Sequence, residues 1–278
     1  MTTFKEIRGT AIESVSSDPS NPEEGQIWYN NTIGVLKDYQ LVADAWATGG
    51  NLNTARAYFS GAGTQTTGVV AGGDTTPGTN SNATEKYNGT SWTNSTNLPG
   101  IRQGGAGAGT QTASLVFGGF GAANPTDVLS SALKFDGTTW TSTGSLSTGR
   151  PQLSGMGTQT AGLAAGGDPS IASTEEFDGS TWTAGGNLGT GRALMSQAGT
   201  QTAGLVVGGG GAQTQTELYN GTSWAVSPAT TANNQFYGGG CGTQPAAVVF
   251  GGGAGTTFRN QTEEFTGGAL TVKTITTS

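Results

Sequence analysis

The stretch GTQTAGLVVGG, at residues 199–209, is one of five similar copies in the chain. Its GTQ triplet begins at residues 63, 109, 157, 199 and 242, which gives spacings of 46, 48, 42 and 43 residues. Its apolar run ending in Gly-Gly recurs at 69–73, 115–119, 163–167, 205–209 and 248–252. A period of about 40–50 residues is typical of solenoids and β-propellers.

Two further landmarks belong to the same period. An aromatic residue, a turn and a tryptophan end the first four copies, with the pairs Tyr87 and Trp92, Phe135 and Trp140, Phe177 and Trp182, and Tyr219 and Trp224. The fifth copy keeps Phe265 but has Leu270 at the tryptophan position. An arginine precedes GTQ in the first four copies, at Arg56, Arg102, Arg150 and Arg192. Each copy is therefore one structural unit.

Each unit is predicted to contain four short strands. No segment shows a helical period, and Gly, Thr, Ser and Asn are poor helix formers. GTQ is expected to join the first two strands, and Asn-Gly or Asp-Gly to join the last two in a type I′ turn. The first strand has small residues, which suits the crowded centre of a propeller, whereas tryptophan suits the outer rim. Cys241 falls in this inner strand and is expected to be a buried apolar residue.

Composition excludes several classes of function. The chain has 50 Gly among 278 residues, no His, one Cys and a net charge of −7. The absence of His excludes Ser-His-Asp and Cys-His triads and the usual zinc sites. The acidic balance argues against nucleic-acid binding, and no apolar run is long enough for membrane insertion. One Cys excludes an internal disulfide framework.

The order of these landmarks resembles the Kelch repeat of β-propellers over residues 49–270. The resemblance implies an all-β propeller of four-stranded blades, and it implies fold rather than function. Five blades are expected in residues 49–278, with 269–276 completing the fifth. In the alternative, residues 26–48 contribute to a sixth blade. Residues 1–48 are expected to form an N-terminal segment, extended up to residue 25 and then a β-meander over QIWYN, VLKDYQLV and AWATG.

The N-terminal segment carries a second resemblance. Residues 16–40, SSDPSNPEEGQIWYNNTIGVLKDYQ, resemble segments near the start of tail-fibre and other virion proteins of bacteriophages. The repeats are similar to those of propellers from marine phages, notably phages of cyanobacteria. These resemblances imply a chain made in the host cytoplasm and placed on the surface of the virion. Residues 1–48 would then bind other virion proteins.

The four arginines are candidate ligand contacts. A ring of guanidinium groups near one mouth of the channel would suit a carboxylated or sulfated sugar or a phosphate. In the alternative, each arginine pairs with backbone carbonyls or with a glutamate two residues before the strand-ending aromatic. These glutamates are Glu85, Glu175, Glu217 and Glu263.

The connections between the second and third strands vary while the framework repeats, which is typical of recognition loops. Their apolar residues Phe120, Val128, Leu129 and Phe258 are candidate contact anchors. In the alternative, these residues fold back over the sheet ends. No cofactor or metal is expected. Asp74, Asp127 and Asp168 follow Gly-Gly pairs, but without the dense ligand spacing of a calcium loop, so solvated turn carboxylates are expected.

We therefore expect a non-enzymatic virion protein that recognises a glycan or protein on the host surface. A decoration protein without receptor contact is the structural alternative. A carbohydrate-active enzyme is a second alternative, because the DGTTW hairpins resemble the Asp box of sialidases. They lack one residue between Asp and Gly, and no Arg triad with a Tyr nucleophile stands out. A cellular scaffold is the third.

Overall fold

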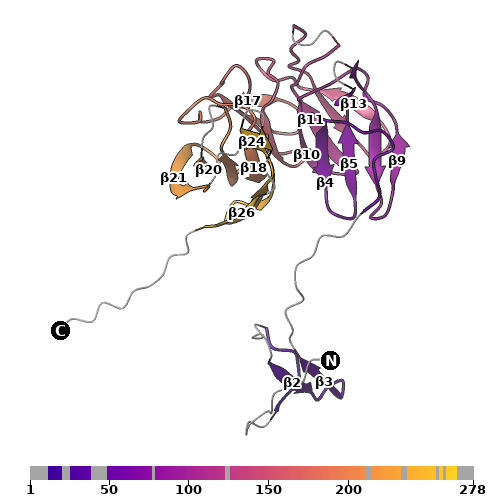
Figure 1. The fold of residues 1–278 in the computed structure, drawn as a ribbon, viewed down its shortest axis with the longest axis vertical. Coiled ribbons are helices and arrows are strands. Elements are labelled where there is room, and N and C mark those ends of the chain that lie inside the picture. The colour runs from indigo at the N-terminus through magenta and orange to yellow at the C-terminus, as the bar shows by residue number, and fades with distance from the viewer. Residues whose placement is uncertain are drawn as a thin grey trace, which may run out of the picture. The chain divides into compact units, whose positions relative to one another are not determined.

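A computed structural model describes residues 12–20, 26–38, 49–76, 79–122, 126–210, 214–232, 237–254, 257–258 and 261–267. The chain divides into two compact units, Met1–Thr48 and Gly49–Ser278. Within the described residues, both units consist of strands, turns and loops without a helix (Figure 1). The expectation of an all-β chain is therefore confirmed for this part of the chain.

The first unit is a small sheet in which β2 (Ile27–Asn30) lies between β1 (Glu13–Val15) and β3 (Val35–Asp38). β1 runs parallel to β2, and β3 runs antiparallel to it. The strands predicted at QIWYN and VLKDYQLV are present in shorter form, and AWATG lies outside the described residues. The residues before 26 contain β1, which pairs within the sheet, so they are not simply an extended lead.

Asp18 joins the strands of this sheet. Its Oδ1 accepts hydrogen bonds from Trp28 Nε1 at 3.0 Å and from Asn30 Nδ2 at 2.9 Å, while its Oδ2 accepts one from Lys37 Nζ at 2.6 Å. The bonds from Lys37, Asn30 and Trp28, in that order, lower the pKa of Asp18 from 3.8 to about 2. The GQIWYN segment is thus organised by a carboxylate from the preceding turn.

The second unit contains five antiparallel sheets, called modules 1 to 5. They are β4-β5-β8-β9, β10-β11-β12-β13, β14-β15-β16-β17, β18-β19-β20-β21 and β22-β23-β26. Their strands are β4 (Ser60–Gly63), β5 (Gly68–Ala71), β8 (Thr84–Tyr87), β9 (Trp92–Ser95), β10 (Ala106–Thr110), β11 (Ala113–Phe117), β12 (Ala132–Phe135), β13 (Trp140–Thr143), β14 (Ser154–Gly157), β15 (Gly162–Ala165), β16 (Thr174–Phe177), β17 (Trp182–Ala184), β18 (Ser196–Gly199), β19 (Gly204–Val207), β20 (Gln215–Tyr219), β21 (Trp224–Thr230), β22 (Gly239–Thr243), β23 (Ala246–Phe250) and β26 (Thr262–Thr266).

Two short ribbons lie in the connections between second and third strands. They are formed by β6 (Asp74–Thr76) with β7 (Thr79–Asn80), and by β24 (Gly253–Ala254) with β25 (Thr257–Phe258). Module 5 has three strands in the described residues, because the fourth strand expected at 269–276 lies outside them. Of the residues weighed for a sixth blade, 26–48, the part from 39 to 48 also lies outside them, and the described part forms β2 and β3 of the first unit.

The hydrophobic core lies between neighbouring modules. One cluster of buried residues combines Leu115 and Phe117 of module 2 with Ala164 and Phe177 of module 3, and Trp182 packs against it. The repeated aromatic pairs are direct cross-strand neighbours, as in Phe177 opposite Trp182 with ring centroids 4.9 Å apart. No single sheet encloses this core, so stacking of the sheets is what buries it.

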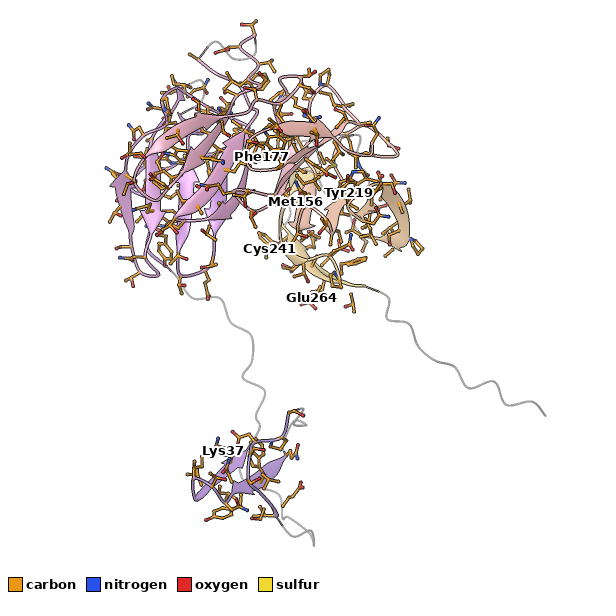
Figure 2. The ribbon with its side chains drawn as sticks, turned by 180° about the vertical axis from the view of Figure 1, so that it is seen from behind. Lys37, Met156, Phe177, Tyr219, Cys241 and Glu264 are labelled. Carbon is orange, nitrogen blue, oxygen red and sulfur yellow. The ribbon has the colours of Figure 1, made fainter. Side chains whose placement is uncertain are left out.

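The innermost strands lie side by side in chain order, β4 next to β10, then β14, β18 and β22. Residues from all five, most of them small, surround a cavity of about 200 Å³, and they include Ala62, Met156 and Cys241. Met156 and Cys241 are labelled in the middle of the second unit in Figure 2. Cys241 was expected to be buried, but it is exposed. This arrangement of sheets is compatible with a propeller-like fold.

The Gly-Gly pair at the end of each second strand is explained by close approach between modules. Gly72 and Gly73 have φ of 72° and 97°. A Cβ on Gly72 would lie 2.2 Å from the carbonyl oxygen of Arg102 in the next module. The Gly73 N–H donates a hydrogen bond of 2.8 Å to this same carbonyl. A larger residue would push the two modules apart.

The turns between third and fourth strands differ from the predicted two-residue type I′ turn. Phe135 pairs with Trp140, which leaves residues 136–139 in the loop. Gly137 has a φ of 94°, whereas Asp136 is not in the left-handed region. The Asp136 Oδ1 instead accepts the N–H groups of Thr138 and Thr139, at 2.8 and 2.7 Å. A side-chain cap thus replaces the second left-handed residue.

Candidate functional site

The repeated arginines are anchored inside their own modules. Ion pairs join Arg56 to Glu85 at 2.6 Å, Arg150 to Glu175 at 2.9 Å and Arg192 to Glu217 at 2.5 Å. The alternative that pairs arginine with glutamate is therefore present in three modules. Burial lowers the pKa of Arg150 and Arg192, and the nearby carboxylates oppose this shift.

The expectation that the arginines form an accessible ring for anions is wrong. The side chains of Arg56, Arg150 and Arg192 are 0% exposed, and Arg102 is 3% exposed. A ligand in solvent cannot reach these buried guanidinium groups, whose terminal nitrogens already donate to carboxylates, carbonyls and hydroxyls. These residues instead hold the end of one module to the connection that enters it.

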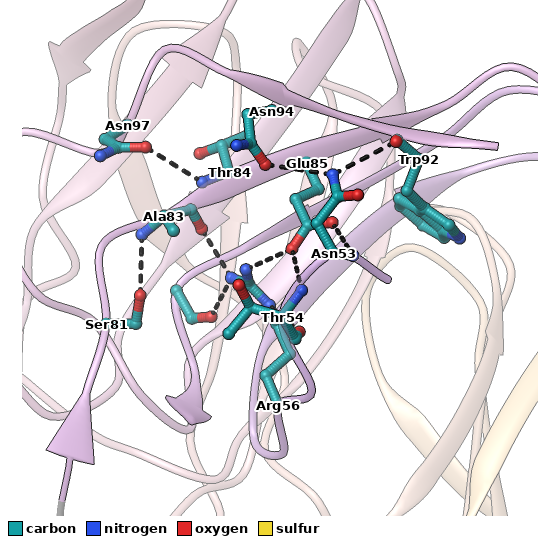
Figure 3. A network of polar contacts seen from close by, with 11 residues as sticks. Asn53, Thr54, Arg56, Ser81, Ala83, Thr84, Glu85, Trp92, Asn94 and Asn97 are labelled. Atoms are coloured by element: carbon teal, nitrogen blue, oxygen red, sulfur yellow. Dashed lines mark hydrogen bonds and ion pairs between the residues drawn. The ribbon is translucent and has the colours of Figure 1, made fainter. Parts of the chain in front are cut away.

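Figure 3 shows this network in module 1. Glu85 accepts hydrogen bonds from the backbone N–H groups of Asn53 and Thr54, at 2.7 and 3.3 Å. Arg56 donates to Glu85 and also to the carbonyls of Gly72 and Ala83, at 2.9 and 2.8 Å. One carboxylate and one guanidinium thus satisfy several buried backbone groups at once.

Module 2 is the exception and supports this role. Leu133 stands at the position of the glutamate, and Pro99, which has no N–H, stands at the position of Asn53. Module 2 therefore lacks both the backbone N–H at the position of Asn53 and the carboxylate that would accept its hydrogen bond. Arg102 donates instead to the Gly118 carbonyl and to Ser131 Oγ, the latter at 2.8 Å. Burial without a carboxylate lowers the pKa of Arg102 to about 10.

In four of the five GTQ turns, the glutamine joins neighbouring modules. Gln159 Nε2 donates to the carbonyls of Ser114 and Phe135 in module 2, at 3.1 and 2.7 Å. The equivalent bonds run from Gln111 to Gly68 and Tyr87, from Gln201 to Gly162 and Phe177, and from Gln244 to Gly204 and Tyr219. Gln65, in module 1, is exposed. The repeated turn is thus an intermodular link.

The outer tryptophans form a second link. Trp140 Nε1 donates to Thr84 Oγ1 of the preceding module at 3.2 Å, and Trp224 Nε1 donates to Thr174 Oγ1 at 2.9 Å. Module 2 has Ala132 at the position of Thr84 and Thr174. The buried Nε1 of Trp182 in module 3 therefore has no hydrogen-bond partner among the described residues.

Replacing Ala132 with threonine should therefore stabilise the protein by about 1 kcal/mol, because it supplies the missing acceptor. Replacing Thr84 with alanine should destabilise it by a similar amount. Urea unfolding of both variants measures the two effects. A lower stability for Ala132→Thr would show that the site cannot accommodate the hydroxyl.

Two hairpins carry carboxylates with unusual acidity. Backbone hydrogen bonds from Thr139 and Thr181, followed by further bonds within each loop, lower the pKa of Asp136 and Asp178 well below the usual value. Both side chains are in exposed loops. The same position holds Asn88 and Asn220 in two other modules, where the amide oxygen accepts the corresponding N–H groups.

Because the folded pKa of these two carboxyls is lowered, they stabilise the fold above their unfolded pKa and stop doing so as pH falls through the folded value. The double variant Asp136→Asn, Asp178→Asn should therefore lose less thermal stability than the natural chain between about pH 5 and about pH 2. Melting curves across this range measure the difference. Parallel curves for the two proteins would contradict the assignment.

The candidate loop anchors have different environments. Phe120 is only 9% exposed and bridges to Gln103 and Val128, so its role as an accessible anchor is corrected to a packing role. Val128 is 43% exposed and Leu129 is half-buried. Phe258 ends β25, and its side chain lies outside what the structure describes.

Sequence reasoning missed a set of residues at one end of the inner strands that line the central cavity, each two positions before the strand begins. Each lies five positions before the Gly of GTQ or its equivalent: Tyr58, Gly104, Gln152, Leu194 and Tyr237. All have positive φ, from 53° at Tyr58 to 63° at Gly104. Backbone hydrogen bonds connect them in order, from the N–H groups of Gly104, Gln152, Leu194 and Tyr237 to the carbonyl of the equivalent residue in the preceding module. We call this set the mouth ring.

Aromatic side chains stand at both ends of the mouth ring. Tyr58 is 47% exposed and Tyr237 is 49% exposed, and their ring centroids are 6.1 Å apart in an edge arrangement. Burial raises the pKa of Tyr237, and the nearby Tyr58 and Asp168 add to the rise. An alignment of the five copies would have shown tyrosine at this position in copies one and five, but not its left-handed backbone.

Within the described residues, no group of three or more acidic or cysteine side chains is arranged to hold a metal ion. The described segments also contain no helix with the length and apolar character needed to cross a membrane. A scan against protein-family models matches no family, and a search of curated proteins finds no similar sequence.

Proposed function

We propose that this chain is a non-enzymatic recognition protein of a bacteriophage virion, in which a five-bladed Kelch-like propeller is displayed to the host surface. The observation that carries the proposal is that the repeated positions fall into two sets, one bonded within the framework and one variable and exposed. Most of the repeated Arg, Glu, Gln and Trp side chains are bonded within the framework. The mouth ring and the connecting loops vary from module to module and carry exposed side chains, which is typical of a recognition surface on a rigid scaffold.

A contact between modules 1 and 5 supports closure of the ring with five blades. Tyr58 and Tyr237 come from these two modules and touch.

The N-terminal unit supports attachment to a particle. It is compact by itself, and β2 and β3 coincide with the GQIWYN and GVLKDY segments that resemble virion proteins. Attachment through residues 1–48 would place many copies of the propeller on one particle. Weak binding at each site then becomes strong adsorption through multivalency.

The test is antibody-gold labelling of intact phage particles, paired with blocking of host adsorption by the purified full chain. The proposal predicts label on the particle surface and a fall in adsorption as the chain is added. Label without blocking would favour a decoration protein. An absence of label on every particle would overturn the virion assignment.

A further inference from the structure

We propose that the mouth ring binds a neutral sugar residue of a glycan, with Tyr58 and Tyr237 as the stacking side chains. This inference rests on the proposed recognition function and names its site and ligand class. Both tyrosines are about half exposed, they stand just before the inner strands β4 and β22, and their ring contact joins the first and fifth modules. Gln152 and Leu194 occupy the equivalent positions in modules 3 and 4.

The left-handed backbone conformation at these positions indicates that the side chains do something other than stabilise the fold. A left-handed φ costs free energy for any residue with a Cβ, and glycine avoids this cost. Gly104 shows that glycine fits the mouth ring, with a φ of 63°. Four of the five copies nevertheless carry Tyr, Gln, Leu and Tyr there. Strained non-glycine residues that cluster in this way are typical of functional sites.

The chemistry of the mouth favours a sugar. Tyrosine offers an apolar ring face together with a hydroxyl, and the Gln152 amide can both donate and accept hydrogen bonds. The Asp168 N–H donates to the carbonyl of Pro151, the residue before Gln152, and Asp168 is exposed, so its carboxylate can accept sugar hydroxyls. These groups match the mixture of aromatic surface and few polar groups found in small-ligand sites.

Charge favours a neutral ligand over an anionic one. The arginines of the described second unit are buried in the framework. Lys86 and Lys134 donate to the carbonyls of Gly137 and Gly179 in the outer hairpins. None of these cations is placed to meet a carboxylate or sulfate at the mouth. A cationic peptide is the competing occupant, since Asp168 would attract it.

The test uses the full chain on an array of neutral oligosaccharides of glucose, galactose, mannose and N-acetylglucosamine, with sulfated and sialylated versions beside them. We expect binding to at least one neutral oligosaccharide that persists in the presence of hexalysine and in 0.5 M salt, which screens interactions between charges. Tyr58→Gly and Tyr237→Gly should each weaken it by at least about tenfold, and Tyr58→Phe should retain it. Tyr29→Ala, an exposed tyrosine of the first unit, is the matched control.

Thermal unfolding of the same variants separates binding from packing. If the tyrosines serve recognition, glycine at these left-handed positions should leave the melting temperature unchanged or raise it. A marked fall would assign the pair to packing between modules 1 and 5 and overturn the proposal. Binding to no neutral oligosaccharide, equal binding by the variants, or displacement by hexalysine would also overturn it.

Failure of this site and failure of the proposed function give different results. If Tyr58→Gly blocks host adsorption as well as the natural chain does, the recognition function stands and the mouth ring is not its site. If the natural chain binds a neutral oligosaccharide through the tyrosines but no particle is labelled, the site stands and the virion assignment falls.

Discussion

Replacing Glu175 with leucine is expected to lower the free energy of unfolding by about 3–5 kcal/mol, because removing one partner of a buried ion pair leaves the other charge uncompensated. Arg150 would lose its carboxylate, and the Ser147 N–H would lose the Glu175 Oε2 acceptor that it contacts at 2.8 Å. Denaturant unfolding followed by tryptophan fluorescence measures the loss.

The matched control is Glu264→Leu, which removes an exposed carboxylate one residue further along the equivalent strand of module 5. Its effect should stay within about 0.5 kcal/mol. Module 2 supplies a second comparison, because it has Leu133 and Pro99 at the positions of Glu175 and Ser147. Adding Ser147→Pro to Glu175→Leu should recover part of the loss, since the orphaned donor is then removed. Equal losses in Glu175→Leu and Glu264→Leu would contradict a structural role for the buried pair.

Replacing Gln201 with alanine is expected to destabilise the protein by about 2 kcal/mol. The change removes two hydrogen bonds to the carbonyls of Gly162 and Phe177 in the preceding module, and buried carbonyls without donors are costly. The same unfolding measurement applies, with the melting temperature as a second readout.

The equivalent change at Gln65 is the internal comparison. Gln65 occupies the same turn position but is exposed in module 1, so Gln65→Ala should change stability by less than about 0.5 kcal/mol. If Gln201→Ala were as mild as Gln65→Ala, the GTQ turn would not link the modules, and another reason for its repetition would be needed.

The repeated part of the architecture could be predicted from the sequence because each copy repeats the same local rules. The apolar run predicts the second strand of each module. The spacing of five residues between Phe177 and Trp182 predicts that they are a cross-strand pair, as the structure shows. The pairing of Arg150 with Glu175 could also be predicted as an alternative, since both recur at fixed positions. A side chain that recurs from module to module usually serves the framework. The prediction that the arginines are accessible ligand contacts was wrong for this reason.

The features that were missed depend on backbone geometry or on contacts between distant segments. The left-handed conformation of Tyr58 has no local signal, because tyrosine rarely adopts it. Asp18 was missed because its partners follow 10 or more residues later in the chain. The type I′ prediction failed because Asp136 caps the loop with its side chain. Cys241 was expected to be buried, but it faces the central cavity.

The central claim is that five modules converge on one axis, and the native cysteine allows a direct test. Cys241 of module 5 and Ala62 of module 1 line the same cavity. In Ala62→Cys, a short bifunctional maleimide should join the two thiols within one chain, as detected by mass spectrometry of the monomer. In the control Thr93→Cys, on the outer strand β9 of module 1, no such link to Cys241 should form. Absence of the Ala62→Cys link, or equal linking in the control, would contradict the account.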